Sequence, residues 1–303
     1  MNPYDILKSA QKGKYAIGSF NFSTAEILKA IVLAAKDLNS PIIVSTSEGE
    51  AEFIGMREAA ALVKAWRAGT KLPIFLNLDH GKSLKSIKKA LAASYDMVHF
   101  DGSELSCEKN ITETKKVADF ACDFEKTFDK RVIIEGELGY LRGSSSLHKQ
   151  KLEIKPEDLT NPERAKEFVE KTGVDSLAIA IGNAHGVFIE GGPALRSLGE
   201  GGERLYLDRL AQIKEAVGEK VFLVLHGGSG IPDEDVKKSI ESGIAKVNVN
   251  TELRVAYKEA LDKELKEKSE ETTPHKILEP SLEAVKKVVE EKIRLFGSEN
   301  KIT

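Results

Sequence analysis

Short apolar runs alternate with amphipathic stretches along the whole chain. Several of the runs are apolar at nearly every position, which is typical of strands buried on both faces of a parallel sheet. The predicted strands are Tyr15–Phe20, Ile42–Thr46, Ile74–Leu78, Met97–Phe100, Val132–Ile134, Ser176–Ile181, Phe222–Leu225 and Ala245–Val249.

Helical patterns separate these runs. Ser23–Leu38 and Ser83–Ala93 each carry apolar residues on one face, and Asn161–Thr172 opens with an N-cap asparagine followed by proline. Two more helical patterns, Glu252–Ser269 and Ser281–Phe296, close the chain. Eight strand–helix alternations predict an α/β fold, a (β/α)8 TIM barrel. We expect one domain over residues 1–303, with a C-terminal helical extension over about 252–296 and long loops at about 139–160 and 188–203.

Bulk composition narrows the classes of function. The 303 residues exceed the roughly 250 that a barrel needs. A net charge of −3 does not indicate a basic face for nucleic acid. The chain has no run of 18 apolar residues, so no membrane span is predicted. Cys107 and Cys122 form no CxxC pair, and the N-terminus lacks a secretory pattern. These features predict a cytoplasmic protein with reduced thiols.

Three histidines follow predicted strands, and the active sites of this fold lie at the C-terminal ends of the strands. His80, His185 and His226 follow the third, sixth and seventh predicted strands, so their rings are expected to meet at the barrel mouth. Three neutral imidazoles leave one position of a Zn²⁺ ion open, as in catalytic sites. We favour this over unrelated rim histidines. His99 lies inside the fourth strand, and we predict that it packs in the barrel interior.

Glycines beside two of these histidines predict a phosphate site. Bare backbone lets N–H groups approach an anion closely, and the loops after strands 7 and 8 commonly bind phosphate in this fold. The residues concerned are Gly186, Gly227, Gly228 and Ser229, with Asn250 and Thr251 at the start of the helix after strand 8. Asp79 directly precedes a predicted metal ligand, where it could either move a proton or orient an imidazole.

These motifs together resemble those of the class II fructose-bisphosphate and tagatose-bisphosphate aldolases, and the resemblance runs along the whole chain. The segments that carry it are YAIGSFN (15–21), LDHG (78–81), FDGS (100–103), EGELG (135–139), VDSLAIAIGNAHG (174–186), LVLHGGS (223–229) and KVNVNT (246–251).

The resemblance implies a role for most residues of the predicted site. It assigns the catalytic zinc to His80, His185 and His226, an alternative zinc position to Glu137, a second divalent cation to Asp101, and acid/base catalysis at the C4 hydroxyl to Asp79. It assigns substrate and phosphate contacts to Asn21, Ser47, Gly186, Gly227, Gly228, Ser229, Asn248, Asn250 and Thr251. It also implies a monovalent cation, Na⁺ or K⁺, on main-chain oxygens near the glycines. Arg254 resembles an arginine that reaches the second phosphate in a neighbouring subunit, which implies a homodimer or homotetramer.

The implied activity is reversible cleavage of a ketose 1,6-bisphosphate to dihydroxyacetone phosphate and glyceraldehyde 3-phosphate, a step of glycolysis and gluconeogenesis. Fructose-type members tend to have Asp at position 250 and tagatose-type members Ala; since Asn250 keeps a polar contact, we favour fructose 1,6-bisphosphate. The alternatives are a tagatose-1,6-bisphosphate aldolase and a non-catalytic paralogue that binds zinc and phosphate. The paralogue stays open because Gly143–Ser146 replaces the acidic run that supplies a proton donor in the family.

Overall fold

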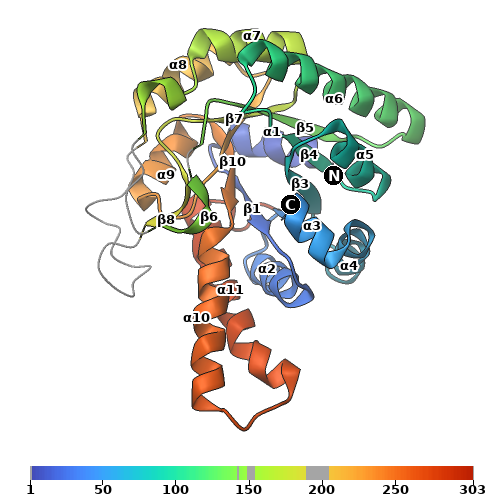
Figure 1. Ribbon diagram of the computed structural model, residues 1–303, viewed down its shortest axis with the longest axis vertical. Coiled ribbons are helices and arrows are strands. Elements are labelled where there is room, and N and C mark those ends of the chain that lie inside the picture. The colour runs from blue at the N-terminus through green and yellow to red at the C-terminus, as the bar shows by residue number, and fades with distance from the viewer. Residues whose placement is uncertain (1, 142, 149–153, 189–204, 303) are drawn as a thin grey trace.

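A computed structural model describes residues 2–141, 143–148, 154–188 and 205–302, and for residues 143–148 and 185–188 it describes the backbone. Eight parallel strands close into a barrel in the order β1-β10-β9-β7-β5-β4-β3-β2 (Figure 1). The predicted (β/α)8 barrel is therefore confirmed. The barrel strands are β1 (Ile17–Asn21), β2 (Ile42–Ser47), β3 (Ile74–Gly81), β4 (Met97–Phe100), β5 (Ile133–Leu138), β7 (Ser176–Ile179), β9 (Phe222–Leu225) and β10 (Ile244–Val249).

Helices cover the outside of the barrel, and several of them begin at residues whose side chains cap the first turn. Thr24, Ser83 and Asn161 each accept a backbone N–H of the first helical turn, which fixes where α2, α5 and α7 start. The helices that follow the strands are α2 (Ala25–Asp37), α3 (Glu48–Ile54), α4 (Met56–Thr70), α5 (Leu84–Ala92), α6 (Cys107–Phe128), α7 (Pro162–Thr172), α8 (Leu207–Val217) and α9 (Asp233–Glu241), with a 3-10 turn at Pro156–Asp158.

An N-terminal helix, α1 (Pro3–Gly13), covers the barrel end opposite the predicted site. A capping box at Asn2 begins it. Its Ile6, Leu7 and Ala10 are buried in a cluster with residues that open the strands, among them Phe222. Because apolar side chains fill this end, polar chemistry is confined to the opposite mouth of the barrel.

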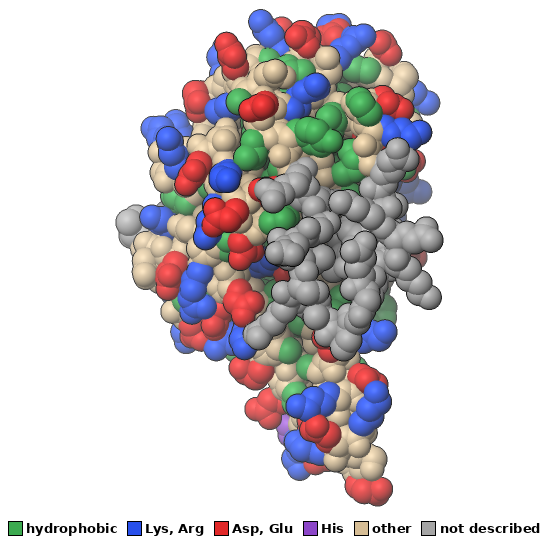
Figure 2. Space-filling model, turned by 90° about the vertical axis from the view of Figure 1, so that its left-hand side faces the viewer, with side chains coloured by type: hydrophobic (Ala, Val, Ile, Leu, Met, Phe, Trp, Pro, Cys, Tyr) green, Lys and Arg blue, Asp and Glu red, His purple; other side chains and the backbone are tan. Residues whose placement is uncertain are grey.

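The chain ends in a helical hairpin of α10 (Thr251–Glu267) and α11 (Pro274–Phe296), which projects from the barrel beside α2 (Figure 1). The last helix was predicted to start at Ser281, and that prediction is wrong: α11 begins two turns earlier, at Pro274. Pro274 occupies a first-turn position, where its missing N–H costs nothing, and Pro280 is accommodated inside the helix. Acidic and basic side chains intermingle over the visible face of the hairpin (Figure 2).

A second, two-stranded parallel sheet pairs β6 (Gly143–His148) with β8 (His185–Phe188). Residues 139–160 were predicted to be a loop, so the strand at Gly143–His148 corrects that prediction. Gly and Ser have low strand propensity, and only the pairing with β8 reveals the strand. Most of the second predicted loop, at 188–203, lies outside the described residues. In the described part of the chain, no helix is long and apolar enough to cross a membrane.

Candidate active site

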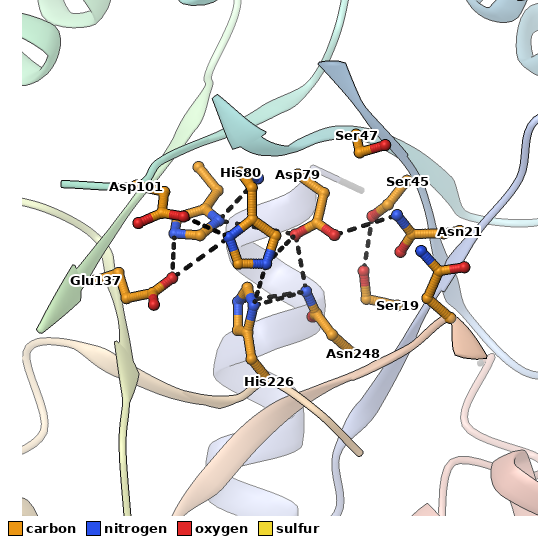
Figure 3. Close-up of polar contacts among 12 residues, drawn as sticks. Ser19, Asn21, Ser45, Ser47, Asp79, His80, Asp101, Glu137, His226 and Asn248 are labelled. Atoms are coloured by element: carbon orange, nitrogen blue, oxygen red, sulfur yellow. Dashed lines mark hydrogen bonds and ion pairs between the residues drawn. The ribbon is translucent and has the colours of Figure 1, made fainter. Parts of the chain in front are cut away.

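A β-bulge in β3 turns two consecutive side chains toward the barrel mouth. The ladder pairs Leu78 with Val98 and then Gly81 with Phe100. Asp79 and His80, between these two pairs, therefore lie opposite a single residue of β4. In a regular strand these neighbours would face opposite sides, whereas a bulge redirects a side chain. His80 adopts a left-handed φ of 52°, and both side chains reach the same cluster (Figure 3).

His80 and His226 direct ring nitrogens toward one another across the mouth. The Nε2 atom of His80 lies 3.1 Å from the Nδ1 atom of His226. Two nitrogen ligands of a tetrahedral zinc ion would lie about 3.3–3.4 Å apart, given Zn–N bonds of about 2.0–2.1 Å. The two rings are therefore spaced as metal ligands would be.

Carboxylates fix the tautomers of these two rings. The Nδ1 atom of His80 donates to Asp101 at 2.8 Å, and the Nε2 atom of His226 donates to Glu135 at 2.8 Å. The nitrogens left to face one another are then the ones that carry lone pairs. Two lone pairs at this distance repel unless a cation or a proton lies between them, which fits a metal site.

His185 is the third predicted ligand, and its side chain lies outside the described residues. Its backbone begins β8, next to the strand end that carries His226. Asn183 donates to the carbonyl oxygen of His226 at 2.9 Å. A Cβ atom on Gly227 would lie 2.1 Å from the carbonyl oxygen of Ala184. These contacts hold the backbone just before His185 against the backbone of His226 and Gly227.

The charges around the rings leave an excess of negative charge. Asp79, Asp101, Glu135 and Glu137 are all buried carboxylates, and the pKa of each is held below its usual value: burial opposes ionisation, but nearby imidazoles and ammonium groups outweigh it. The two ammonium groups, Lys82 and Lys246, lie 2.7 Å from Asp101 and Glu135 respectively. Imidazoles that bind a metal must be neutral, and the four carboxylates and two ammonium groups then leave two negative charges unbalanced, which suits a divalent cation.

The pKa of His80 also indicates a site that suits a cation. Burial lowers the pKa of His80, but the negative charge of Asp79 and the hydrogen bond to Asp101 outweigh burial and raise it above the usual value. The pKa of His226 is lowered by burial, and Glu135 only partly offsets this. The Nε2 atom of His99 and the Oε2 atom of Glu137 are buried without an aligned hydrogen bond, although they lie 3.1 Å apart. Two groups have the spacing of metal ligands: the first is Asp79, His80, His99 and His226, and the second is His80, Asp101 and Glu137.

Asp79 is held between two amide groups. Its Oδ2 atom accepts from Asn21 at 3.1 Å and its Oδ1 atom from Asn248 at 3.0 Å. These bonds fix the carboxylate beside the rings, with its Oδ1 atom 3.9 Å from the Nε2 atom of His80. An ionised, immobilised carboxylate next to the ligand group can accept a proton from a substrate oxygen.

The predicted phosphate residues lie around the ends of β9 and β10. Gly227 has a φ of 62°, and Gly228 donates its N–H to the carbonyl oxygen of Asn248 at 2.9 Å. The amide of Gly228 is therefore occupied and shapes the turn. Ser229 is buried and accepts from the N–H of Glu252. The other predicted contacts lie nearby: Asn250 directly precedes α10, Thr251 and Arg254 lie in the first turn of that helix, and Gly186 lies in β8.

Three side chains enter the site without having been assigned to it from the sequence. Glu50 accepts from Asn21 at 2.9 Å and from Asn250 at 3.2 Å, and Ser47 caps the helix that carries it. Glu135 binds His226, and its alternation with Glu137 along β5 was a usable signal. The ring of His99 lies 4.8 Å, centroid to centroid, from the rings of both His80 and His226. His99 is fully buried, but it contacts the cluster rather than only packing in the interior.

Comparisons with known proteins agree with this geometry. The family model described as fructose-bisphosphate aldolase class-II matches residues 1–301. The YdjI aldolase of Escherichia coli K12 is 31% identical, with a TM-score of 0.79, over 99% of this chain and 98% of that one. A candidate fructose-1,6-bisphosphate aldolase of Coccidioides immitis is 29% identical, with a TM-score of 0.79, over 99% and 97% of the two chains.

A more distant structure supports the fold alone. The fructose-bisphosphate aldolase of Campylobacter jejuni is 21% identical, with a TM-score of 0.78, over 98% of this chain and 94% of that one. The family match covers nearly the whole chain, and the barrel mouth carries a cluster of imidazoles and carboxylates with metal-ligand spacing. The chain therefore belongs to the class II fructose-bisphosphate aldolase family and is an aldolase, a carbon–carbon lyase.

Proposed function

We propose that this protein is a zinc-dependent aldolase that reversibly cleaves fructose 1,6-bisphosphate to dihydroxyacetone phosphate and glyceraldehyde 3-phosphate. The proposal depends above all on one observation. The Nε2 atom of His80 and the Nδ1 atom of His226 face one another at 3.1 Å, with the Asp79 carboxylate beside them.

His80, His185 and His226 would hold the zinc ion and leave one side for substrate oxygens. Bound there, zinc supplies Lewis-acid stabilisation of the charge that develops on the ketose oxygens during cleavage. Glu137 would offer an alternative ligand position, and Asp101, in the second group, a second divalent site. Main-chain oxygens near the glycines would hold Na⁺ or K⁺.

Asp79 would remove the proton from the C4 hydroxyl as the C3–C4 bond breaks, and would return it in the condensation direction. Its low pKa keeps it ionised as a base, and the two bonded amides hold it in one orientation. The fixed position reduces the entropy lost in reaching the reactive geometry.

Unpartnered amide oxygens support a polyhydroxylated substrate. The Oδ1 atoms of Asn21, Asn248 and Asn250 are buried without a hydrogen-bond donor. A buried acceptor without a donor costs free energy, and sugar hydroxyls are suitable donors. Gly227, Ser229 and Thr251 would bind the phosphate of the three-carbon product, with Gly186 and Ser47 at the edge of the site. Asn250 favours fructose 1,6-bisphosphate over its C4 epimer through a polar contact.

We also propose that residues 1–303 act as one cytoplasmic aldolase domain in a homodimer or homotetramer. Arg254 lies in the first turn of α10, at the base of the projecting hairpin, where it could reach a phosphate bound by a neighbouring subunit. Sedimentation velocity would measure the oligomeric state.

A coupled assay for triose phosphate tests the activity. Zinc-loaded protein should cleave fructose 1,6-bisphosphate with a higher kcat/KM than tagatose 1,6-bisphosphate, and a chelator should abolish both activities. His80→Ala, His185→Ala and His226→Ala should each lower zinc content and turnover together. Full activity in zinc-free protein would contradict the mechanism, whereas tight phosphate binding without turnover of either sugar would favour the non-catalytic paralogue.

A further inference from the structure

The bulge in β3 removes the ladder partner of one backbone amide. Leu78 and Gly81 keep their pairing with β4, and the extra residue falls between them. The N–H of His80 lies in this interruption of the ladder. The acceptor that it finds is the Nδ1 atom of the His99 ring, at 3.1 Å.

This bond fixes the tautomer of His99. If Nδ1 accepts from an N–H group, the ring proton is on Nε2, and that atom lies 3.1 Å from the Oε2 atom of Glu137. Both nitrogens of His99 thus face groups of the protein. The ring is fully buried, and it lies between the backbone that carries His80 and the carboxylate of Glu137.

The geometry points to His99 as a positioning residue for the metal ligand His80. The left-handed φ of 52° at His80 is unfavourable for a residue with a Cβ atom, so the bulge needs an external constraint. A shift of β3 by one residue would pair the His80 amide with β4, and it would also move the ring to the other face of the strand. By accepting this amide, His99 stabilises the bulged register and keeps the ring directed at the site.

The packing on the other side of the bulge is consistent with this role. A Cβ atom on Gly81 would lie 2.9 Å from the carbonyl oxygen of His99. The backbones of β3 and β4 therefore approach closely at this point, which keeps the backbone of His99 next to the bulge. The inference rests on the proposed function in one respect, namely that His80 binds the metal.

Asn and Leu at position 99 form a matched pair for the test. The two side chains have similar shapes, and the Oδ1 atom of Asn stands close to where the Nδ1 atom of His stands, whereas Leu offers no acceptor. We expect His99→Asn to bind Co²⁺ with an affinity within a few-fold of the wild type and with the same visible absorption spectrum. We expect His99→Leu to lose about 10–100-fold in Co²⁺ affinity, as for other residues that orient a metal ligand. Affinity is measured by competition with a chromophoric chelator.

Wild-type affinity in the Leu variant, or equal losses in the two variants, would overturn the inference. A measurement on the unsubstituted zinc-loaded protein covers the case in which neither variant folds. ¹⁵N NMR of histidine-labelled protein should show Nδ1 of His99 without a proton and Nε2 with one; a proton on Nδ1 would refute the role. Failure of the proposed function would give a different result. Co²⁺ binding would still distinguish the two variants, but the unsubstituted protein would cleave neither bisphosphate.

Discussion

Lys246→Met tests the buried charge network beneath the site. The ammonium group of Lys246 is fully buried and lies 2.7 Å from the Oε2 atom of Glu135, whose other oxygen binds His226. Met has a similar volume but no charge, so the Glu135 carboxylate loses its cation inside the barrel. Removal of one partner of a buried pair costs about 3–5 kcal/mol. With an unfolding entropy of about 2.1 cal/mol/K per residue, 303 residues give about 0.64 kcal/mol/K, so Tm should fall by roughly 5–8 °C.

The assay is thermal unfolding of metal-free protein, which separates the charge network from metal binding. Lys266→Met is the control, because that lysine is exposed and pairs with exposed Asp262. An exposed pair contributes at most about 1 kcal/mol, so Tm should change by less than about 2 °C. Adding Glu135→Gln to Lys246→Met should recover part of the loss, since the unpaired charge is then removed.

The loss should also depend on pH. In the wild type, burial opposes ionisation of Glu135, but Lys246 and His226 outweigh it and keep the pKa low, so the pair stabilises the fold above the unfolded-state pKa of about 4.3. Without the lysine the pKa of Glu135 rises, and the folded variant can take up a proton. The Tm difference should therefore shrink as pH falls from about 8 to about 5.5. A Tm change below 2 °C at pH 8, or one that does not depend on pH, would refute the reasoning.

Two further predictions concern the barrel mouth. Asp79→Asn should keep bound zinc but lose about 10²–10⁴-fold in kcat, as for removal of a general base, and unchanged turnover in the coupled assay would exclude that role. Gly81→Ala should lower both Tm and Co²⁺ affinity, because the new Cβ atom would lie 2.9 Å from the His99 carbonyl oxygen. Its control is Gly49→Ala, where a Cβ atom meets nothing within 4 Å; equal effects of the two substitutions would show that the close contact is unimportant.

Apolar runs predicted the barrel well because its strands are buried on both faces. Met97–Phe100 and Phe222–Leu225 match β4 and β9 at both ends. The third strand was predicted to stop at Leu78, but it continues to Gly81. The continuation is polar because it carries the site, so an apolar pattern cannot detect it.

Segments stabilised mainly by tertiary contacts were harder to predict. β6 consists largely of glycine and serine, and its pairing with β8 is not visible in a single strand's sequence. The N-terminal helix α1 did have local signals that went unused. Asn2, Pro3 and Asp5 form a capping sequence ahead of an apolar face.

The site itself was predictable as far as residues at strand ends define it. His80 and His226 were selected in this way, and their ring nitrogens meet. His99 was interpreted as interior packing because it precedes its strand end. Its contact with His80 depends on the bulge, and a bulge depends on the register between two strands rather than on either sequence.

Because the bulge turns both Asp79 and His80 toward the mouth, a proposed proton acceptor and a proposed metal ligand are neighbours in sequence, joined by one peptide bond in the barrel wall. Consecutive Cα atoms are about 3.8 Å apart in any chain, so covalent geometry limits their separation whatever the surrounding loops do. Natural variation or design could therefore change the connections around the barrel mouth while this pair keeps its spacing. The same peptide bond prevents independent adjustment, since a substitution that repositions Asp79 must also rotate His80.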